Sequence, residues 1–318
     1  MKYIFATFLL LNTFHLFGQE SAPINHELSF QFDNDLLFFD AGDRYYTNGL
    51  FFTYRQKIKE DRSWSNLFGF QSLHKSIFHV AFVSKIFNPY NLKGEKAEEI
   101  DRPYAGELYV DGLYTSYWGQ NRLAVGVDLG WLGTKTRSDD IQTNLHTTFG
   151  WVRPRGWRDY QIHDTPIAHL YTGLSREIVS IGPLSLISDV DVRVGTINTN
   201  AAAAITMRLG RSQPLDASVL THARTGERIA NDRKCKELFF VTKTQLMHVF
   251  YDATIEGNII GEPSPFVKSA EPWVWMQSVG VMLSMKTFDL QALWSFLGRE
   301  VVGGRPHKYG TLVIAKRF

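Results

Sequence analysis

The sequence predicts an all-β protein, a twelve-stranded antiparallel transmembrane β-barrel of a bacterial outer membrane with a short helix in an extracellular loop. Many segments alternate apolar and polar residues with a period of two. Aromatic residues make up 14% of the chain, an excess that such a barrel uses in girdles at the two membrane interfaces. The chain also begins with a short apolar run and ends with an aromatic residue inside an apparent strand.

The N-terminal segment has the pattern of a secretory signal peptide. Lys2 is the first charged side chain, and an apolar run reaches Phe17, ahead of the small residue Gly18. This run is shorter than the roughly 20 residues that a spanning helix needs, and its composition is typical of a cleaved signal. We therefore expect residues 1–18 to be removed and residues 19–318 to form one barrel domain; the alternative is a buried N-terminal helix.

Composition narrows the class further. The single cysteine, Cys235, cannot form an internal disulfide, so the fold is not cross-linked in this way. A formal net charge of +2 and a mean hydropathy of −0.17 exclude a helical membrane protein. We expect no nucleic-acid partner.

Three segments show the alternation of a barrel wall most clearly. Residues 123–131 place Leu, Val and Trp opposite small and charged residues, and residues 189–194 alternate Val with Asp and Arg. Residues 288–296 alternate Phe, Leu and Trp with Asp, Gln and Ser. A soluble β-sandwich also alternates, but it rarely opposes an apolar wall with small and charged residues in so many strands, so we favour the barrel.

The strand count is twelve, an even number, as in single-chain bacterial barrels. The last segment, YGTLVIAKRF, ends in Phe318 on the face of Leu312 and Ile314, although Lys316 interrupts that face. The predicted strands cover approximately residues 26–34, 45–57, 77–87, 104–118, 121–132, 165–180, 183–195, 199–209, 237–257, 273–286, 287–298 and 307–318.

The connections alternate between the two sides of the membrane. With both termini in the periplasm, the outward connections are residues 35–44, 88–103, 133–164 and 258–272. Residues 58–76 and 210–236 are long and fall on the periplasmic side, where short turns are expected. The sequence offers no physical reason for their length.

Polar residues gather at the outward connections. The stretch FDNDLLFFDAGDRYYTNGLFFTYRQ carries Asn34 and Asp35 at the end of one strand, opposite Thr47 at the start of the next. Rigid positioning is possible there, so these residues are candidates for a functional site. Asp40 and Asp43 are interpreted as turn residues, because Asp tolerates turn conformations.

A short helix is predicted within SDDIQTNLHTTFGW, residues 138–151. Gln142 and His146 are four positions apart and share one of its faces. A lone histidine on a helix is usually structural or solvated, but this pair faces the same rim as Asn34 and Asp35.

Basic residues are also frequent in the outward connections. Arginine suits phosphate oxygens, and any outer-membrane barrel benefits from positive charge beside anionic lipid. Charge pairs that brace the barrel mouth are a further alternative, either Asp43 with Arg44 or Asp101 with Arg102. The basic residues are Lys93, Lys96, Arg102, Arg153, Arg155 and Arg158.

These motifs together resemble the lipid A 3′-O-deacylase family of outer-membrane enzymes. The resemblance rests on FDNDL, DRYYTNGL, DRPYAG, the helix with Gln142 and His146 followed by RGWRDYQIHD, and YDATIEGN, all between about residues 26 and 257. It implies a twelve-stranded barrel with its site near the outer surface, beside a loop helix. It also implies a calcium-dependent carboxylic ester hydrolase that removes the 3′-linked acyl chain of lipid A.

The resemblance carries roles to individual positions. It implies catalytic roles for His146, Gln142, Asn34 and Thr47, and a metal site at Asp35, Asn34 and Thr47. The family has an acidic residue a few positions beyond the histidine, for which residues 151–153 offer no counterpart. The residues expected to bind substrate are Lys93, Arg102, Arg153 and Arg155.

The implied chemistry suits these residue types. An imidazole accepts a proton at neutral pH, and Ca²⁺ prefers carboxylate and carbonyl oxygens, here Asp35 and the main chain around Thr47 to Gly49. Such an ion would stabilise the oxyanion. No GxSxG motif is present, which disfavours an acyl-enzyme route.

The expected partners are lipid A or lipopolysaccharide in the outer leaflet and, during biogenesis, the outer-membrane barrel assembly machinery. The alternatives to a lipid A deacylase are a non-catalytic pore or scaffold barrel, and a phospholipase that acts on glycerophospholipids.

Overall fold

Twelve antiparallel strands close into one barrel, in which each strand pairs with its neighbours in sequence and β1 pairs with β12. The computed structural model describes residues 24–38, 43–58, 75–226 and 235–318, so the predicted signal peptide, Asp40 and nearly all of the connection 58–76 lie outside the described residues. The strands are β1 (His26–Asn34), β2 (Tyr45–Lys57), β3 (Lys75–Asn88), β4 (Ala105–Trp118), β5 (Asn121–Leu132), β6 (Thr165–Ile181), β7 (Leu184–Gly195), β8 (Asn198–Arg211), β9 (Cys235–Asp252), β10 (Trp273–Met285), β11 (Phe288–Leu297) and β12 (His307–Arg317).

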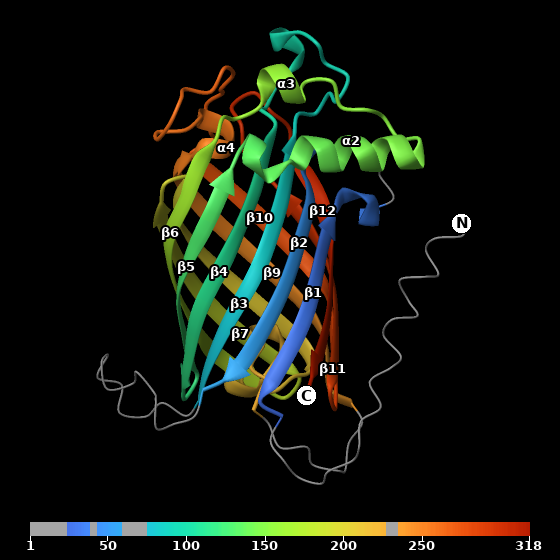
Figure 1. Cartoon of the computed structure of the whole chain (residues 1–318). Coiled ribbons are helices and arrows are strands. Elements are labelled where there is room, and N and C mark those ends of the chain that lie inside the picture. Colours follow the sequence, from blue (N-terminus) through green and yellow to red (C-terminus); the bar gives the residue numbers. More distant parts are fainter. Residues whose placement is uncertain (1–23, 39–42, 59–74, 227–234) are drawn as a thin grey trace.

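Helical segments lie in the connections. Figure 1 shows α2, α3 and α4 at one end of the barrel and the C-terminus at the other, so the helical end is the outer one under the predicted topology. No helix within the described residues is long and apolar enough to span a membrane. The segments are η2 (Asp35–Phe38), η5 (Ala97–Glu99), η6 (Thr134–Thr136), α2 (Ser138–Phe149), α3 (Trp157–Tyr160), η7 (Leu215–Ala217), η8 (Val219–Thr221) and α4 (Ala253–Glu256).

The predicted strands are confirmed in number and nearly in extent. The largest difference is β9, which ends at Asp252 and not at residue 257. The Asp252 side chain accepts a hydrogen bond from the Thr254 backbone N–H at 2.9 Å and so caps α4, which ends the strand.

The two sides of the wall differ as the alternation requires. On β5, Val125, Val127, Leu129 and Trp131 are exposed on the outer surface, whereas Ala124 and Asp128 are buried inside. The valines of β7 are likewise exposed, and so are Leu290, Trp294 and Phe296 of β11. An exposed apolar band is stable only in lipid, so the outer surface of the wall is its membrane face.

Charged pairs fill the inward side. Arg55 donates to Glu27 at 2.9 Å, and Arg208 donates to Glu177 at 2.8 Å, and all four residues are buried. Buried charges remain stable only when paired in this way, because each has lost its hydration. The interior is therefore a packed ionic network at these levels.

The long connection after β8 now has a structural explanation. Its described part, residues 212–226, folds against the inner wall, and Tyr117 OH donates to the Thr221 carbonyl at 2.9 Å. Val219 of the same segment packs in an apolar cluster with Phe239 of β9. The segment fills the periplasmic end of the lumen, which disfavours the open-pore alternative.

Candidate active site

The candidate site begins where β1 ends. Asn34 Oδ1 accepts a hydrogen bond from the Leu36 N–H at 2.8 Å, and this turn starts η2. A Cβ atom at Gly310 of β12 would lie 2.5 Å from Leu37 Cβ, so η2 needs a glycine there to pack closely. Along β12, Val313 and Ala315 point into the barrel and Leu312 points outward. Because successive strand residues point to opposite faces, Gly310 is on the same outward face as Leu312. Asp35 is therefore held on the membrane side of the wall, outside the lumen.

Two residues at the start of β2 have a left-handed backbone. Asp43 and Tyr45 have φ of 40° and 58°, a region that aspartate tolerates and that a bulky tyrosine avoids. Hydrogen bonds hold Tyr45 there, since its OH donates to Asp101 Oδ2 at 2.6 Å and accepts from the Arg305 N–H at 2.9 Å. Strain of this kind clusters at functional sites because the surrounding structure must enforce it.

A β-bulge sets the orientation of Thr47. The register of β2 against β3 shifts between Tyr46 and Asn48, which leaves Thr47 out of the regular pairing. Its Oγ1 donates to Asp43 Oδ1 at 2.6 Å. Bulges are often found beside active sites, where they redirect one side chain. Here the bulge fixes the carboxylate of Asp43.

Helix α2 supplies the histidine. Gly150, with φ of 71°, ends the helix and reverses the chain, so that His146 Nδ1 contacts the carbonyl oxygen of Val152. The ring also meets Trp151 edge-on at 5.6 Å between centroids. Because a carbonyl oxygen only accepts, Nδ1 carries a proton and donates it to Val152.

His146 Nε2 lies 2.8 Å from Asp43 Oδ2, and this contact joins α2 to the β1–β2 connection. Both side chains are shielded, His146 at 3% exposure and Asp43 at 14%. The interpretation of Asp43 as a simple turn residue is therefore wrong. It supplies the carboxylate beside the histidine that residues 151–153 lack.

Gln142 takes a different position from the one expected. It is buried, and its Oε1 accepts a hydrogen bond from Trp157 Nε1 at 2.8 Å. This bond ties α2 to α3, which packs on Tyr104 and Leu92. Gln142 thus shares the buried face with His146, as the spacing predicts, but its amide oxygen contacts α3.

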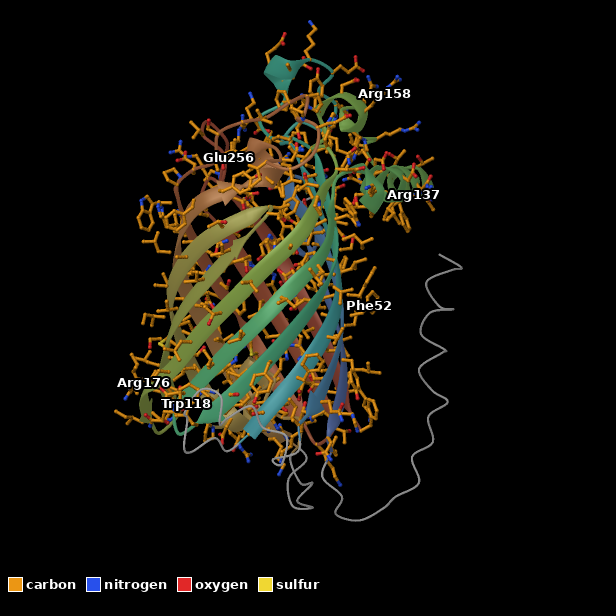
Figure 2. All side chains as sticks on the ribbon, turned by 60° about the vertical axis from the view of Figure 1, so that its left-hand side comes forward. Phe52, Trp118, Arg137, Arg158, Arg176 and Glu256 are labelled. Carbon is orange, nitrogen blue, oxygen red and sulfur yellow. The ribbon has the colours of Figure 1, made fainter. Side chains whose placement is uncertain are left out.

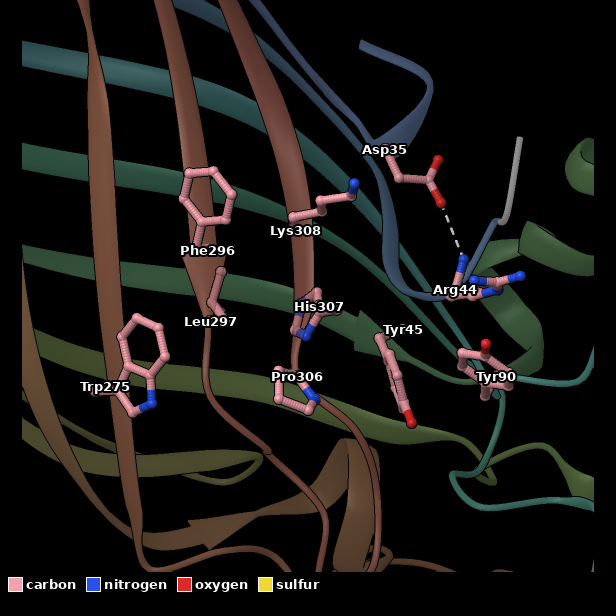
Figure 3. A pocket seen from close by; sticks show the side chains of 10 residues that line it. All are labelled: Asp35, Arg44, Tyr45, Tyr90, Trp275, Phe296, Leu297, Pro306, His307 and Lys308. Atoms are coloured by element: carbon pink, nitrogen blue, oxygen red, sulfur yellow. Dashed lines mark hydrogen bonds between the residues drawn. The ribbon is translucent and has the colours of Figure 1, made fainter. Parts of the chain in front are cut away.

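Two hollows meet at this place. One, of about 360 Å³, is lined by residues that include Asp43, Lys93, Trp151 and Val152, and it opens beside His146. The other, of about 280 Å³, extends from Asp35 to Trp275 and Phe296 on the outer wall, and Leu297 also lines it. Figure 3 shows Asp35 and Arg44 on one side of this second hollow, and Trp275 and Phe296 on the other. Arg44 and Tyr90 line both hollows.

The carboxylates present fit a divalent cation in part. Asp35 Oδ2 accepts from the Arg44 N–H at 2.9 Å, while Oδ1 is buried without a hydrogen-bond partner. Burial, and next the charge of Asp43, raise the pKa of Asp35 to about 7. Two neighbouring carboxylates with one orphaned oxygen are what a cation would stabilise. The described residues contain no group of three or more Asp, Glu, His or Cys side chains suited to a metal, so main-chain oxygens or water would complete the shell.

The expected substrate-binding residues separate into different surroundings. Lys93 lines the hollow beside Asp43, and Arg153 is exposed after α2. Arg155 is exposed and pairs with Glu95.

The prediction that Arg102 binds substrate is wrong. Its side chain is fully buried, donates to Glu300 at 2.9 Å and to Thr254 at 2.8 Å, and lies over the ring of Phe87. It ties the outward connections together and is not accessible to a substrate. Asp101 likewise braces the mouth through Tyr45 OH, and not through a pair with Arg102.

Sequence reasoning missed two arginines. The guanidinium carbon of Arg44 lies 4.2 Å from the ring centroid of Tyr90, and that of Arg305 lies 4.1 Å from the same centroid. One aromatic ring therefore holds two cations at the boundary between the hollows. Their sequence separation hides this arrangement.

The closed twelve-stranded barrel, with its apolar outer band and a site on the outer wall, defines a β-barrel protein of the bacterial outer membrane. The chain belongs to the family of outer membrane protein LpxR, whose model matches residues 4–318. This confirms the lipid A 3′-O-deacylase family that the motifs resemble, and membership supports a hydrolase that deacylates lipid A in the outer membrane.

One solved structure supports the fold. LpxR from Salmonella typhimurium has a TM-score of 0.72 at 16% identity, over 92% of this chain and 100% of that chain. The transport unit of the autotransporter AIDA-I from Escherichia coli has a TM-score of only 0.46 at 9% identity, over 99% of this chain and 97% of that chain. A comparison with curated proteins found no match.

Proposed function

We propose that this protein is a calcium-dependent esterase that hydrolyses the 3′-O-linked acyl or acyloxyacyl chain of lipid A. The observation that carries the proposal is the contact between His146 and Asp43 beside the orphaned oxygen of Asp35, on the membrane side of the wall. A lipid ester reaches such a site laterally from the leaflet, without entering the lumen.

His146 is proposed as the general base. Its Nδ1–H is fixed on the Val152 carbonyl, which leaves Nε2 to accept a proton. Nε2 faces Asp43 Oδ2 at 2.8 Å, which leaves no room for a water between them, so the attacking water would take the place of Asp43 Oδ2 beside Nε2 and donate one proton to that nitrogen. Thr47 Oγ1 donates to Asp43 Oδ1 and keeps the carboxylate near the ring, where its charge would stabilise the imidazolium that forms.

The reaction then needs one water and no covalent enzyme intermediate. The water oxygen bonds to the carbonyl carbon while its proton passes to Nε2. The ester C–O bond breaks next, and the departing sugar oxygen takes a proton from the imidazolium, so that a fatty acid and a sugar hydroxyl are formed. His146 returns to its neutral state.

The proposed cation site consists of Asp35 and Asp43 with main-chain oxygens near Thr47. A bound Ca²⁺ would supply Lewis-acid stabilisation of the oxyanion, which is worth several kcal/mol in general. Asn34 holds the turn that presents Asp35, so its role is positioning.

The hollows suggest how the substrate lies. Trp275, Phe296 and Leu297 offer an apolar surface for an acyl chain that starts at Asp35. Arg44, Arg305 and Lys93 offer cations for a phosphate, since arginine binds phosphate oxygens in pairs.

Mass spectrometry of lipid A after incubation with the purified, refolded protein tests the proposal. With Ca²⁺ we expect a mass loss equal to the 3′-acyl group, and with chelator no loss. Unchanged lipid A in the presence of Ca²⁺ and a folded barrel would refute it. Release of fatty acid from glycerophospholipid alone would identify a phospholipase instead.

Replacing Arg44 and Arg305 together with alanine is expected to raise KM for lipid A about 10-fold or more, because charge-assisted hydrogen bonds contribute about 1.5–3 kcal/mol each. The same variant is expected to treat dephosphorylated lipid A like the natural protein. The matched control, Arg137→Ala with Arg158→Ala, removes two exposed arginines that do not lie over Tyr90. An equal rise in KM for both substrates would contradict phosphate binding.

A further inference from the structure

Helix α2 has an apolar face that the site does not use. Ile141, Leu145 and Phe149 are 45%, 45% and 54% exposed, and their spacing of four aligns them in one stripe. Trp151, just after the helix, is 44% exposed and stacks on Phe149. The buried pair Gln142 and His146 occupies the adjacent face of α2. The remaining face is polar and consists of Asp140, Thr143, Asn144, Thr147 and Thr148.

The path of α2 is fixed at both ends. A Cβ atom at Gly106 would lie 2.1 Å from Ser138 Oγ, so the helix starts against β4, on the outward side that Gly106 shares with Val110. It ends where Trp151 and the β1–β2 connection line one hollow. In Figure 1, with the outer end up, α2 therefore runs in front of the wall from β4 towards β1, across the barrel axis.

The hand of the helix then decides which way the stripe points. Seen from its first residue, successive side chains of a right-handed helix turn clockwise by about 100°. With the wall to the left, where His146 points, the preceding Leu145 turns down towards the membrane. The following Thr147 turns up towards water. Ile141 and Thr143 lie in the same way on either side of Gln142.

The segment that leads into α2 marks the level of the interface between membrane and water. Trp131, at the end of β5, is 41% exposed, and Lys135 Nζ lies 3.5 Å from the centroid of its ring. Exposed tryptophan at a strand end with a lysine above it is the arrangement of a barrel's interfacial girdle. Figure 2 shows Phe52 on the outer wall below α2, so the stripe continues the lipid-facing surface of the barrel.

We infer that α2 is an interfacial helix whose stripe, Ile141, Leu145 and Phe149, inserts among the acyl chains of the outer leaflet. Amphipathic helices with large apolar residues on one face lie in the membrane plane in this manner. His146 and Leu145 occupy adjacent faces, so the insertion places the site at the level of lipid ester groups. The inference rests on the outer-membrane location and does not require the proposed reaction.

Spin-label accessibility tests the inference. In a chain with Cys235→Ser, single cysteines at Leu145, Thr147 and Phe52 are labelled, and the protein is inserted into phosphatidylethanolamine–phosphatidylglycerol vesicles. We expect the label at Leu145 to collide with oxygen more than with a water-soluble nickel chelate, like the label at Phe52. The label at Thr147 is expected to show the reverse.

The Phe52 label reports barrel insertion within the same set of variants, so a misfolded chain is recognised. If the Phe52 label is in lipid while the Leu145 label favours the nickel chelate, the inference is overturned. Equal lipid exposure at Leu145 and Thr147 overturns the inferred orientation as well.

A second measurement connects the surface to activity. Ile141→Ser with Leu145→Ser is expected to slow deacylation of vesicle-embedded lipid A about 10-fold, and to leave the rate on detergent-dispersed lipid A unchanged. Asn144→Ser with Thr147→Ser is the matched control. Slower deacylation of both vesicle-embedded and detergent-dispersed lipid A would indicate damage to the site. An unchanged rate on vesicle-embedded lipid A would contradict the role of insertion. Absence of deacylation in every variant would refute the proposed function, while the spin labels would still decide the position of α2.

Discussion

The variant His146→Ala is expected to deacylate lipid A about 1000-fold more slowly than the natural protein, because a positioned general base typically contributes 10²–10⁴-fold. The loss belongs in kcat, with KM little changed, since the imidazole is proposed to act on the water and not to bind the substrate. The barrel itself should stay folded, because His146 lies on α2 outside the wall. Initial rates of fatty-acid release at saturating Ca²⁺ measure the effect.

His163→Ala is the matched control, because His163 also lies in an outward connection but has no part in the site. Asp43→Asn is expected to give a smaller loss, since it keeps the shape of the side chain and removes the charge that faces Nε2. An unimpaired rate in His146→Ala would end the general-base interpretation. An equal loss in His163→Ala would attribute the effect to general damage of the loops.

The fold could be predicted because lipid imposes a strict rule on every strand. Each outward residue of the wall must be apolar and each backbone group must be paired within the barrel, so alternation persists along β5, β7 and β11. The end of β9 was missed for a local reason. Tyr251 and Asp252 continue the strand pattern, but the Asp252 cap and the hydrogen bond from its N–H to Glu256 favour one turn of helix.

Residue spacing within single helices and strands also predicted part of the site. The spacing of Gln142 and His146 is a property of one helix, and Asn34 and Asp35 are marked by their place at a strand end. Asp43 could not be assigned in this way. Its contact with His146 depends on the left-handed backbone at Asp43 and on the bulge at Thr47, and no short sequence pattern encodes either.

The roles of the basic residues also could not be assigned from the sequence. Arg102 and Arg155 are both arginines of outward connections, yet one is fully buried on Glu300 and the other is exposed. Charge alone does not distinguish an internal brace from a substrate contact, because burial depends on how distant connections pack. Tyr90 brings Arg44 and Arg305 together for the same reason.

Asp35→Asn is expected to raise the Ca²⁺ concentration for half-maximal activity on the order of 100-fold, about 2.7 kcal/mol, because carboxylate charge sets the affinity of such sites. The side chain keeps its shape, and the Arg44 N–H can still donate to its oxygen. Activity should therefore recover in part at high Ca²⁺. Rates measured across a Ca²⁺ titration, with Asp159→Asn on α3 as the matched control, give the shift.

The pH dependence of that titration separates a ligand from a structural carboxylate. Without a cation the pKa of Asp35 is about 7, so at pH 6 the group is mostly protonated and Ca²⁺ must displace a proton, whereas at pH 8 it is mostly ionised. The natural protein is therefore expected to bind Ca²⁺ more tightly at pH 8 than at pH 6. Asp35→Asn has no proton to displace at this position, so its Ca²⁺ affinity should change less between the two pH values. An equal pH dependence in both proteins would place the cation away from Asp35, and an unchanged Ca²⁺ requirement in the variant would do the same.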